Sequence, residues 1–109
     1  MNVYDTANKL ASEIRASNEY LEYKKLKEFL NSSSVLKEKV NAFEKARYEA
    51  QIDAMQGKQD TEKLKEVQNL YSELLKVDDM RKYFDAELKF NVMLTDINKI
   101  IGESVKDVM

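Results

Sequence analysis

The chain has 109 residues, with 18 basic and 20 acidic side chains and a net charge of −2 at neutral pH. This length fits one domain over residues 1–109, and the balanced charge gives no basic block for binding nucleic acid or an anionic membrane. Cysteine and histidine are absent, which excludes disulfides and removes the usual ligands of zinc and iron–sulfur sites. We therefore expect no cofactor and no transition metal. The lack of cysteine and of a signal-peptide core favours the cytoplasm.

The N-terminal third of the chain predicts two helices. Proline is absent and glycine occurs only at positions 57 and 102, so little interrupts a helix. We expect a first helix over about 3–15 and a second over about 18–30, with Ser17 as a cap between them. The break is weak, and the two could also form one bent helix. The first helix carries one apolar face, made of Val3, Ala7, Leu10, Ala11 and Ile14.

The rest of the chain predicts three more helices, and so an all-α protein. "NSSS" at 31–34 is a stop-and-cap signal before a helix over about 35–56. "QGKQD" at 56–60 places Gly57 as a left-handed terminator and Asp60 as the next cap, before a helix over about 61–76. "VDD" at 77–79 precedes the last helix, over about 79–105.

These helices predict a bundle with a buried core. Short connections favour antiparallel neighbours, so the third and fourth helices should form a long hairpin, with the fifth packed back along it. Six apolar residues on the main stripes should be buried: Phe43, Leu64, Tyr71, Phe90, Leu94 and Ile97.

Catalytic motifs are not indicated. A nucleophile with a histidine base is excluded by composition, and a phosphate loop needs glycines closer together than 57 and 102. The pair Asp78-Asp79 is best interpreted as a helix start. Arg47 interrupts an apolar stripe, either as a surface side chain or as an ion-pair partner of Glu87. We expect no catalytic residue; an acid–base pair of lysine and glutamate ranks lowest among our hypotheses.

The last helix is apolar on two sides. In "AELKFNVMLTDINKIIGES", residues 86–104, one stripe contains Phe90, Leu94, Ile97 and Ile101. A second side is turned well away from it, and the third helix shows the same pattern. Two-sided helices in a small chain favour a second packing partner, most simply another copy. We predict a dimer interface formed by these second sides: Tyr48, Ile52, Met55, Phe84, Leu88 and Val92. The alternative is that they cover the first two helices within one chain.

Three segments together resemble the YheA/YmcA/YlbF family of small bacterial proteins. They are "YDTANKLASEIRASNEYLEYKKLK", then "F…QGK…E", and "AELKFNVMLTDINKII", the most specific of the three. The resemblance covers nearly the whole chain and is greatest to the YheA branch. It implies an all-α, dimer-forming protein of Gram-positive-type bacteria. The YlbF and YmcA branches act in a complex that modulates RNA processing, competence and biofilm development. That complex has been linked to iron–sulfur clusters through cysteines, which this chain lacks.

The resulting functional hypothesis is a non-enzymatic, cytoplasmic helical protein that homodimerises and acts through protein–protein contacts. The alternative is an accessory factor of RNA processing or of competence and biofilm regulation, as in the related branches. A contiguous stripe of lysine and arginine on the folded surface would favour the RNA-associated alternative.

Overall fold

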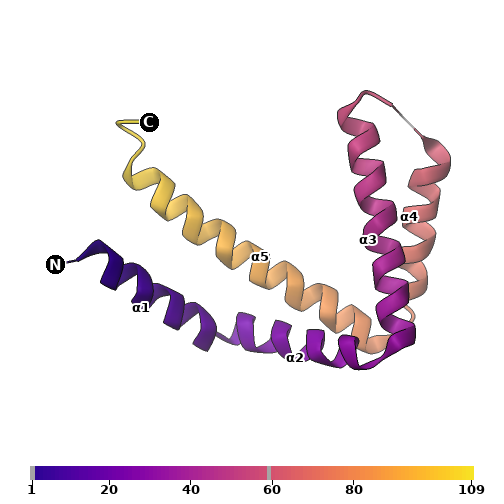
Figure 1. Cartoon of the computed structure of the whole chain (residues 1–109), viewed down its shortest axis with the longest axis horizontal. Helices are drawn as coiled ribbons and strands as arrows, with labels where there is room; N and C mark the ends of the chain where they lie inside the picture. Colours follow the sequence, from indigo (N-terminus) through magenta and orange to yellow (C-terminus); the bar gives the residue numbers. More distant parts are fainter. Residues whose placement is uncertain (1, 59) are drawn as a thin grey trace. The chain divides into compact units, whose positions relative to one another are not determined.

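The computed structural model describes residues 2–58 and 60–109, which fold into five α-helices with no strand among them (Figure 1). The helices are α1 (Val3–Ala16), α2 (Asn18–Ser32), α3 (Ser34–Met55), α4 (Thr61–Leu74) and α5 (Asp78–Ser104). The predicted all-α class is therefore confirmed. The observed helix ends lie within a few residues of the predicted ones.

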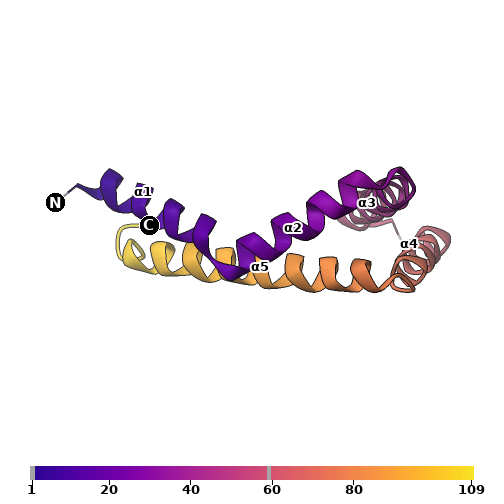
Figure 2. The ribbon, with the colours of Figure 1, turned by 90° about the horizontal axis from the view of Figure 1, so that it is seen from below.

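Side-chain and glycine caps define these ends. The Ser17 hydroxyl accepts a hydrogen bond from the Tyr20 N–H at 3.2 Å and so begins α2, where the chain changes direction after α1 (Figure 2). Ser33 caps α3 by accepting from the Leu36 N–H at 3.3 Å. Gly57, with φ of +75°, ends the turn after α3 in the left-handed region, where a Cβ would be strained. The Asp60 carboxylate then accepts from two N–H groups at the start of α4.

The chain divides into two compact units, each described here by itself. The first, called the terminal unit, contains residues 1–27 and 83–109, and the second, called the hairpin unit, contains residues 28–82. The boundaries fall inside α2 and α5. We expected the last helix to pack along the third and fourth, but the structure groups residues 83–109 with the N-terminal segment instead.

The hairpin unit is built on α3 and α4, which pack antiparallel. Lys63 near the start of α4 forms ion pairs with Glu49 at 3.3 Å and Asp53 at 3.6 Å, both late in α3. Near the other end, the rings of Phe43 and Tyr71 lie 5.5 Å apart. Six apolar residues are buried in this unit: Leu30, Val40, Phe43, Ala46, Leu74 and Met80.

The terminal unit joins the first half of α2 to α5 through an aromatic cluster. The centre of the Tyr23 ring lies 5.4 Å from that of Phe90 and 5.6 Å from that of Tyr83. The Tyr23 hydroxyl donates a hydrogen bond to the Glu87 carboxylate at 3.2 Å. Tyr20 contacts Phe90 at 6.1 Å. Among the described residues of this unit only Leu26, Tyr83 and Ala86 are buried. Helix α1 contributes no buried residue.

The predicted core needs correction. Phe43 is buried as expected, but Leu64 is 52% exposed and Tyr71 is 38% exposed. Both lie on α4, where packing against α3 covers only part of their surface, as the contact of the Tyr71 ring with Phe43 illustrates. Phe90, Leu94 and Ile97 are half-buried rather than buried. Within the terminal unit α5 is covered by a single layer of helix.

Candidate protein–protein interface

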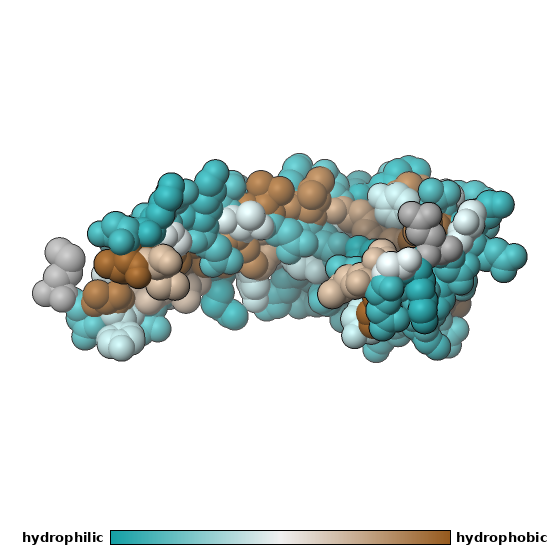
Figure 3. Space-filling view, turned by 90° about the horizontal axis from the view of Figure 1, so that it is seen from above, coloured by the Kyte–Doolittle hydropathy of each residue, from teal (hydrophilic) through white to brown (hydrophobic). Residues whose placement is uncertain are grey.

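One side of α5 presents apolar side chains to the surface. Leu88 is 61% exposed and Val92 is 50% exposed, one helical turn apart. Figure 3 shows patches of apolar surface that interrupt the hydrophilic exterior on one face of the molecule. Exposed Leu and Val side chains are ordinary when they stand singly, but two adjacent ones on a long helix form a small continuous patch.

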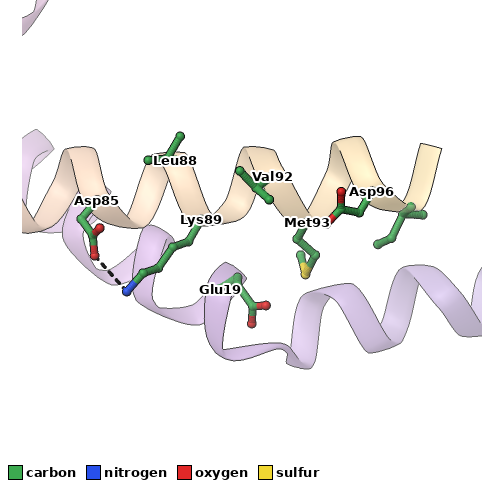
Figure 4. Close-up of a pocket in the computed structure, with 8 residues that line it drawn as sticks. Glu19, Asp85, Leu88, Lys89, Val92, Met93 and Asp96 are labelled. Carbon is green, nitrogen blue, oxygen red and sulfur yellow. Dashed lines mark ion pairs between the residues drawn. The ribbon is translucent and has the colours of Figure 1, made fainter. Parts of the chain in front are cut away.

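A shallow groove borders this patch. It lies between the start of α2, at Glu19, and α5, whose apolar lining residues are Leu88, Val92, Met93 and Ile97. Figure 4 shows that the charged lining residues come from α5 as well as from α2. Asp85 and Lys89 form an ion pair at 3.0 Å along the rim, with both side chains mostly exposed. An apolar strip with charged edges is typical of a surface that receives another helix.

The six residues predicted for the interface do not all share one environment. On α3, Tyr48 is 64% exposed and Met55 is 81% exposed, while Ile52 is half-buried. On α5, Phe84 is half-buried and its ring lies 5.6 Å from the Tyr83 ring. The α3 residues belong to the hairpin unit and the α5 residues to the terminal unit. They therefore form two sets, one in each unit, and each set has a half-buried member.

A second exposed apolar surface was not predicted. Val3 and Tyr4 on α1 are each 80% exposed, and near the end of α5 Ile100 is 71% and Ile101 53% exposed. The apolar stripe on α1 and the position of Ile101 are visible in the sequence, but neither was among the residues predicted for the interface. Figure 1 shows the N- and C-terminal ends of this unit at the same end, where α1 and α5 diverge.

Several charged groups among the described residues form local pairs. A hydrogen bond to Glu49, with Asp53 nearby, raises the pKa of Lys63 above its ordinary value. A hydrogen bond from Arg81, together with Lys82, lowers the pKa of Asp78. Arg47 is exposed and pairs with Glu44 on its own helix, while Glu87 accepts from Tyr23, so of the two interpretations of Arg47 the structure agrees with the surface side chain.

The described residues provide neither a cluster of metal ligands nor a membrane-spanning helix. They contain no group of three or more acidic side chains placed to hold a metal ion. No helix in residues 2–58 and 60–109 combines the length and the apolar character needed to cross a membrane.

Comparison with known proteins places the chain in a family. The model for "Control of competence regulator ComK, YlbF/YmcA" matches residues 3–106. The chain belongs to the YlbF/YmcA family. The family resemblance read from the sequence is thereby confirmed.

Relatives of the YlbF/YmcA chain extend over nearly its full length. It is 33% identical to a UPF0342 protein of Desulfitobacterium hafniense, covering 100% of this chain and 89% of that protein. It is 34% identical to a UPF0342 protein of Symbiobacterium thermophilum, covering 94% of this chain and 93% of that protein. UPF0342 is an uncharacterised family, so these names assign no activity.

A solved structure shares the fold. It is described as a "Protein of Unknown Function (DUF964) from Bacillus stearothermophilus", with a TM-score of 0.81 over 97% of this chain and 94% of that one. The two sequences are 12% identical, so the likeness concerns the fold alone.

Proposed function

We propose that this YlbF/YmcA-family chain is a cytoplasmic, non-enzymatic protein that homodimerises and acts through protein–protein contacts. The observation that supports this most is the terminal unit, where α1 has an apolar face but no buried residue. On α5 of the same unit, Leu88 and Val92 are half or more exposed. A helix in a globular protein is normally stabilised by packing its apolar face, and one chain provides too little cover here.

The energies are compatible with a dimer. Burying an exposed Leu or Val side chain contributes about 1.5–3 kcal/mol. Two such residues from each of two copies would contribute roughly 6–12 kcal/mol, against an association cost of about 4–15 kcal/mol. The α5 patch alone is therefore marginal, and the exposed residues of α1 supply additional apolar area.

The test introduces charge on each exposed set. Leu88→Glu with Ile52→Lys, and each change alone, should be compared with the wild type by light scattering and circular dichroism. The matched control, Asn98→Glu with Gln51→Lys, makes the same charge changes at exposed polar sites on the same two helices. A folded monomer for the double variant, with a dimeric control, is the expected result.

The single variants separate the two sets. If only Leu88→Glu dissociates the dimer, the interface uses α5, and Tyr48, Ile52 and Met55 on α3 are free for another role. An unchanged dimer in all variants would exclude both sets. An unfolded Leu88→Glu chain would mean that this side of α5 belongs to the core of a single chain.

A regulatory role is a second candidate, because the matching family model is described by the control of the competence regulator ComK. Such a role includes an accessory part in RNA processing or biofilm regulation. We propose that the chain fulfils it by contacting partner proteins rather than by binding RNA. The reason is the balance of 18 basic against 20 acidic side chains. Fluorescence anisotropy with single-stranded RNA should show weak binding at physiological salt. Submicromolar affinity that falls steeply with salt would instead favour direct RNA contact.

A further inference from the structure

The exposed face of α5 has acidic and basic residues at regular positions before and after Val92. At about 100° per residue, Asp85 and Lys99 lie roughly 20° to either side of Val92 on the helical wheel. On one edge of the face are Lys89 and Asp96, and on the opposite edge are Leu88 and Thr95. These charged side chains are all exposed, and within one chain Asp85 and Lys89 already pair with each other at 3.0 Å, so a partner copy would extend this surface pair into a network. The face thus has an apolar centre with charges at defined distances before and after it.

Charged residues at matching distances before and after Val92 have opposite charge. Asp85 lies seven residues before Val92 and Lys99 seven after it, with opposite charge. Lys89 lies three residues before and Asp96 four after, again with opposite charge and on the same edge of the face. A second α5 that runs antiparallel to the first, related to it by a two-fold axis at Val92, would therefore place an acidic residue opposite a basic one in both pairs. A parallel, in-register copy would place every charge against its own kind, which is unfavourable.

We propose that α5 pairs antiparallel with α5 of a second copy, with the two-fold axis at Val92. This arrangement rests on the homodimerisation proposed above and specifies its geometry. Val92 meets Val92 of the partner copy at the centre. Asp85 then lies at the level of Lys99 of the partner copy, and Lys89 beside its Asp96. Leu88 packs beside Thr95 of the partner copy on the other edge.

Neighbouring registers fit the charges less well. Moving the axis two residues towards the C-terminus would place Lys89 level with Lys99 of the partner copy and Asp85 level with its Glu103, which are like charges. Moving it two residues towards the N-terminus would place Lys89 level with Asn91 and Asp85 level with Thr95, which gives neither charge an opposite charge on the partner copy. Of these three registers, the Val92-centred one is thus the one in which these charges are complementary.

Single cysteines can test this register, because the natural chain has none. At a two-fold axis a residue meets itself, and packed helices 8–10 Å apart bring two facing Cα atoms to roughly 4–6 Å, within disulfide range. Val92→Cys should therefore form a covalent dimer on mild oxidation. The matched control is Asn98→Cys, an exposed site on the same helix but off the proposed contact face. It should stay uncrosslinked.

A mixing experiment adds a second arm. Asp85→Cys and Lys99→Cys should each crosslink poorly alone, because each site would lie far from its own copy. Their mixture, after subunit exchange, should crosslink several-fold more than either alone. Light scattering on the same samples before oxidation reports whether a dimer is present.

The outcomes are distinguishable. A dimer in which Val92→Cys crosslinks no better than Asn98→Cys overturns this register while the proposed homodimerisation stands. A monomer at every concentration overturns both. A dimer with efficient crosslinking through Val92→Cys and through the mixed pair supports the antiparallel geometry.

Discussion

The hairpin unit and the terminal unit are of nearly equal size but bury very different amounts of apolar side chain. The hairpin unit, residues 28–82, contains Val40, Phe43 and Leu74 among its buried residues, and α3 and α4 cover each other along their length. The terminal unit, residues 1–27 and 83–109, buries only Leu26, Tyr83 and Ala86 among its described residues. The hairpin unit therefore buries more apolar side chain within a single chain, although Tyr48, Met55 and Leu64 are exposed there, and the terminal unit leaves apolar residues of α1 and α5 uncovered.

The difference indicates where stability and assembly reside. A buried side chain contributes to folding through the apolar area it removes from water, and an exposed one can contribute only when a partner covers it. We therefore expect substitutions in the hairpin unit to change the folding free energy of the chain. Substitutions on the outer face of α5 should chiefly change its association.

The largest effect should come from the most deeply buried leucine. Leu74 is 1% exposed, so Leu74→Ala should lower the free energy of unfolding by about 2–5 kcal/mol through lost transfer energy and a cavity. Leu64→Ala, on the same helix but 52% exposed, should cost less than about 1 kcal/mol. Urea denaturation of both variants measures the difference. Equal losses would mean that α4 is covered on both sides.

A leucine-to-alanine substitution in the terminal unit should lower the free energy of unfolding by less than Leu74→Ala does. Leu94 is half-buried, so Leu94→Ala should lower the free energy of unfolding by about 1–2 kcal/mol, since only part of its area leaves water on folding. Urea denaturation beside Leu74→Ala gives the comparison directly. If the two variants lost the same stability, the contrast between the units would fail.

Removal of a helix cap should have a smaller effect. The Asp60 carboxylate accepts from the Glu62 and Lys63 N–H groups at 3.1 and 3.2 Å. Asp60→Ala should lower stability by about 1 kcal/mol because it leaves those donors without this acceptor, and Asp60→Asn should restore most of the loss. Thermal unfolding followed by circular dichroism would show it. No difference between the alanine and asparagine variants would contradict the cap.

The smallest effect concerns Asp78. Its pKa is lowered by the hydrogen bond from Arg81 and by Lys82, so its charged form is favoured in the folded state. Its contribution is therefore present above the ordinary value of 3.8 and is lost as the pH falls through the lower, folded pKa. Asp78→Asn should shift the urea midpoint slightly at about pH 7 and not at about pH 2. A shift of equal size at both values would contradict an electrostatic role.

Local signals predicted the helices, and side-chain packing explains what they could not predict. Ser17, Gly57 and Asp60 act on their immediate neighbours, so their capping roles could be predicted from residue type and position. Leu64 was predicted to be buried but is exposed, because burial depends on which helices lie opposite, and periodicity does not specify that. For α1, periodicity identified the apolar face but not that its residues stay unburied. For the interface, periodicity identified Leu88 and Val92 as lying off the main stripe, and their exposure agrees with that position.

Sedimentation equilibrium of the wild-type chain over a wide concentration range tests the central claim most directly. The claim is that the apolar faces of the terminal unit are covered by a second copy. We predict a species of twice the 12.7 kDa chain mass, which dissociates only on dilution. A mass of 12.7 kDa at all concentrations would contradict it.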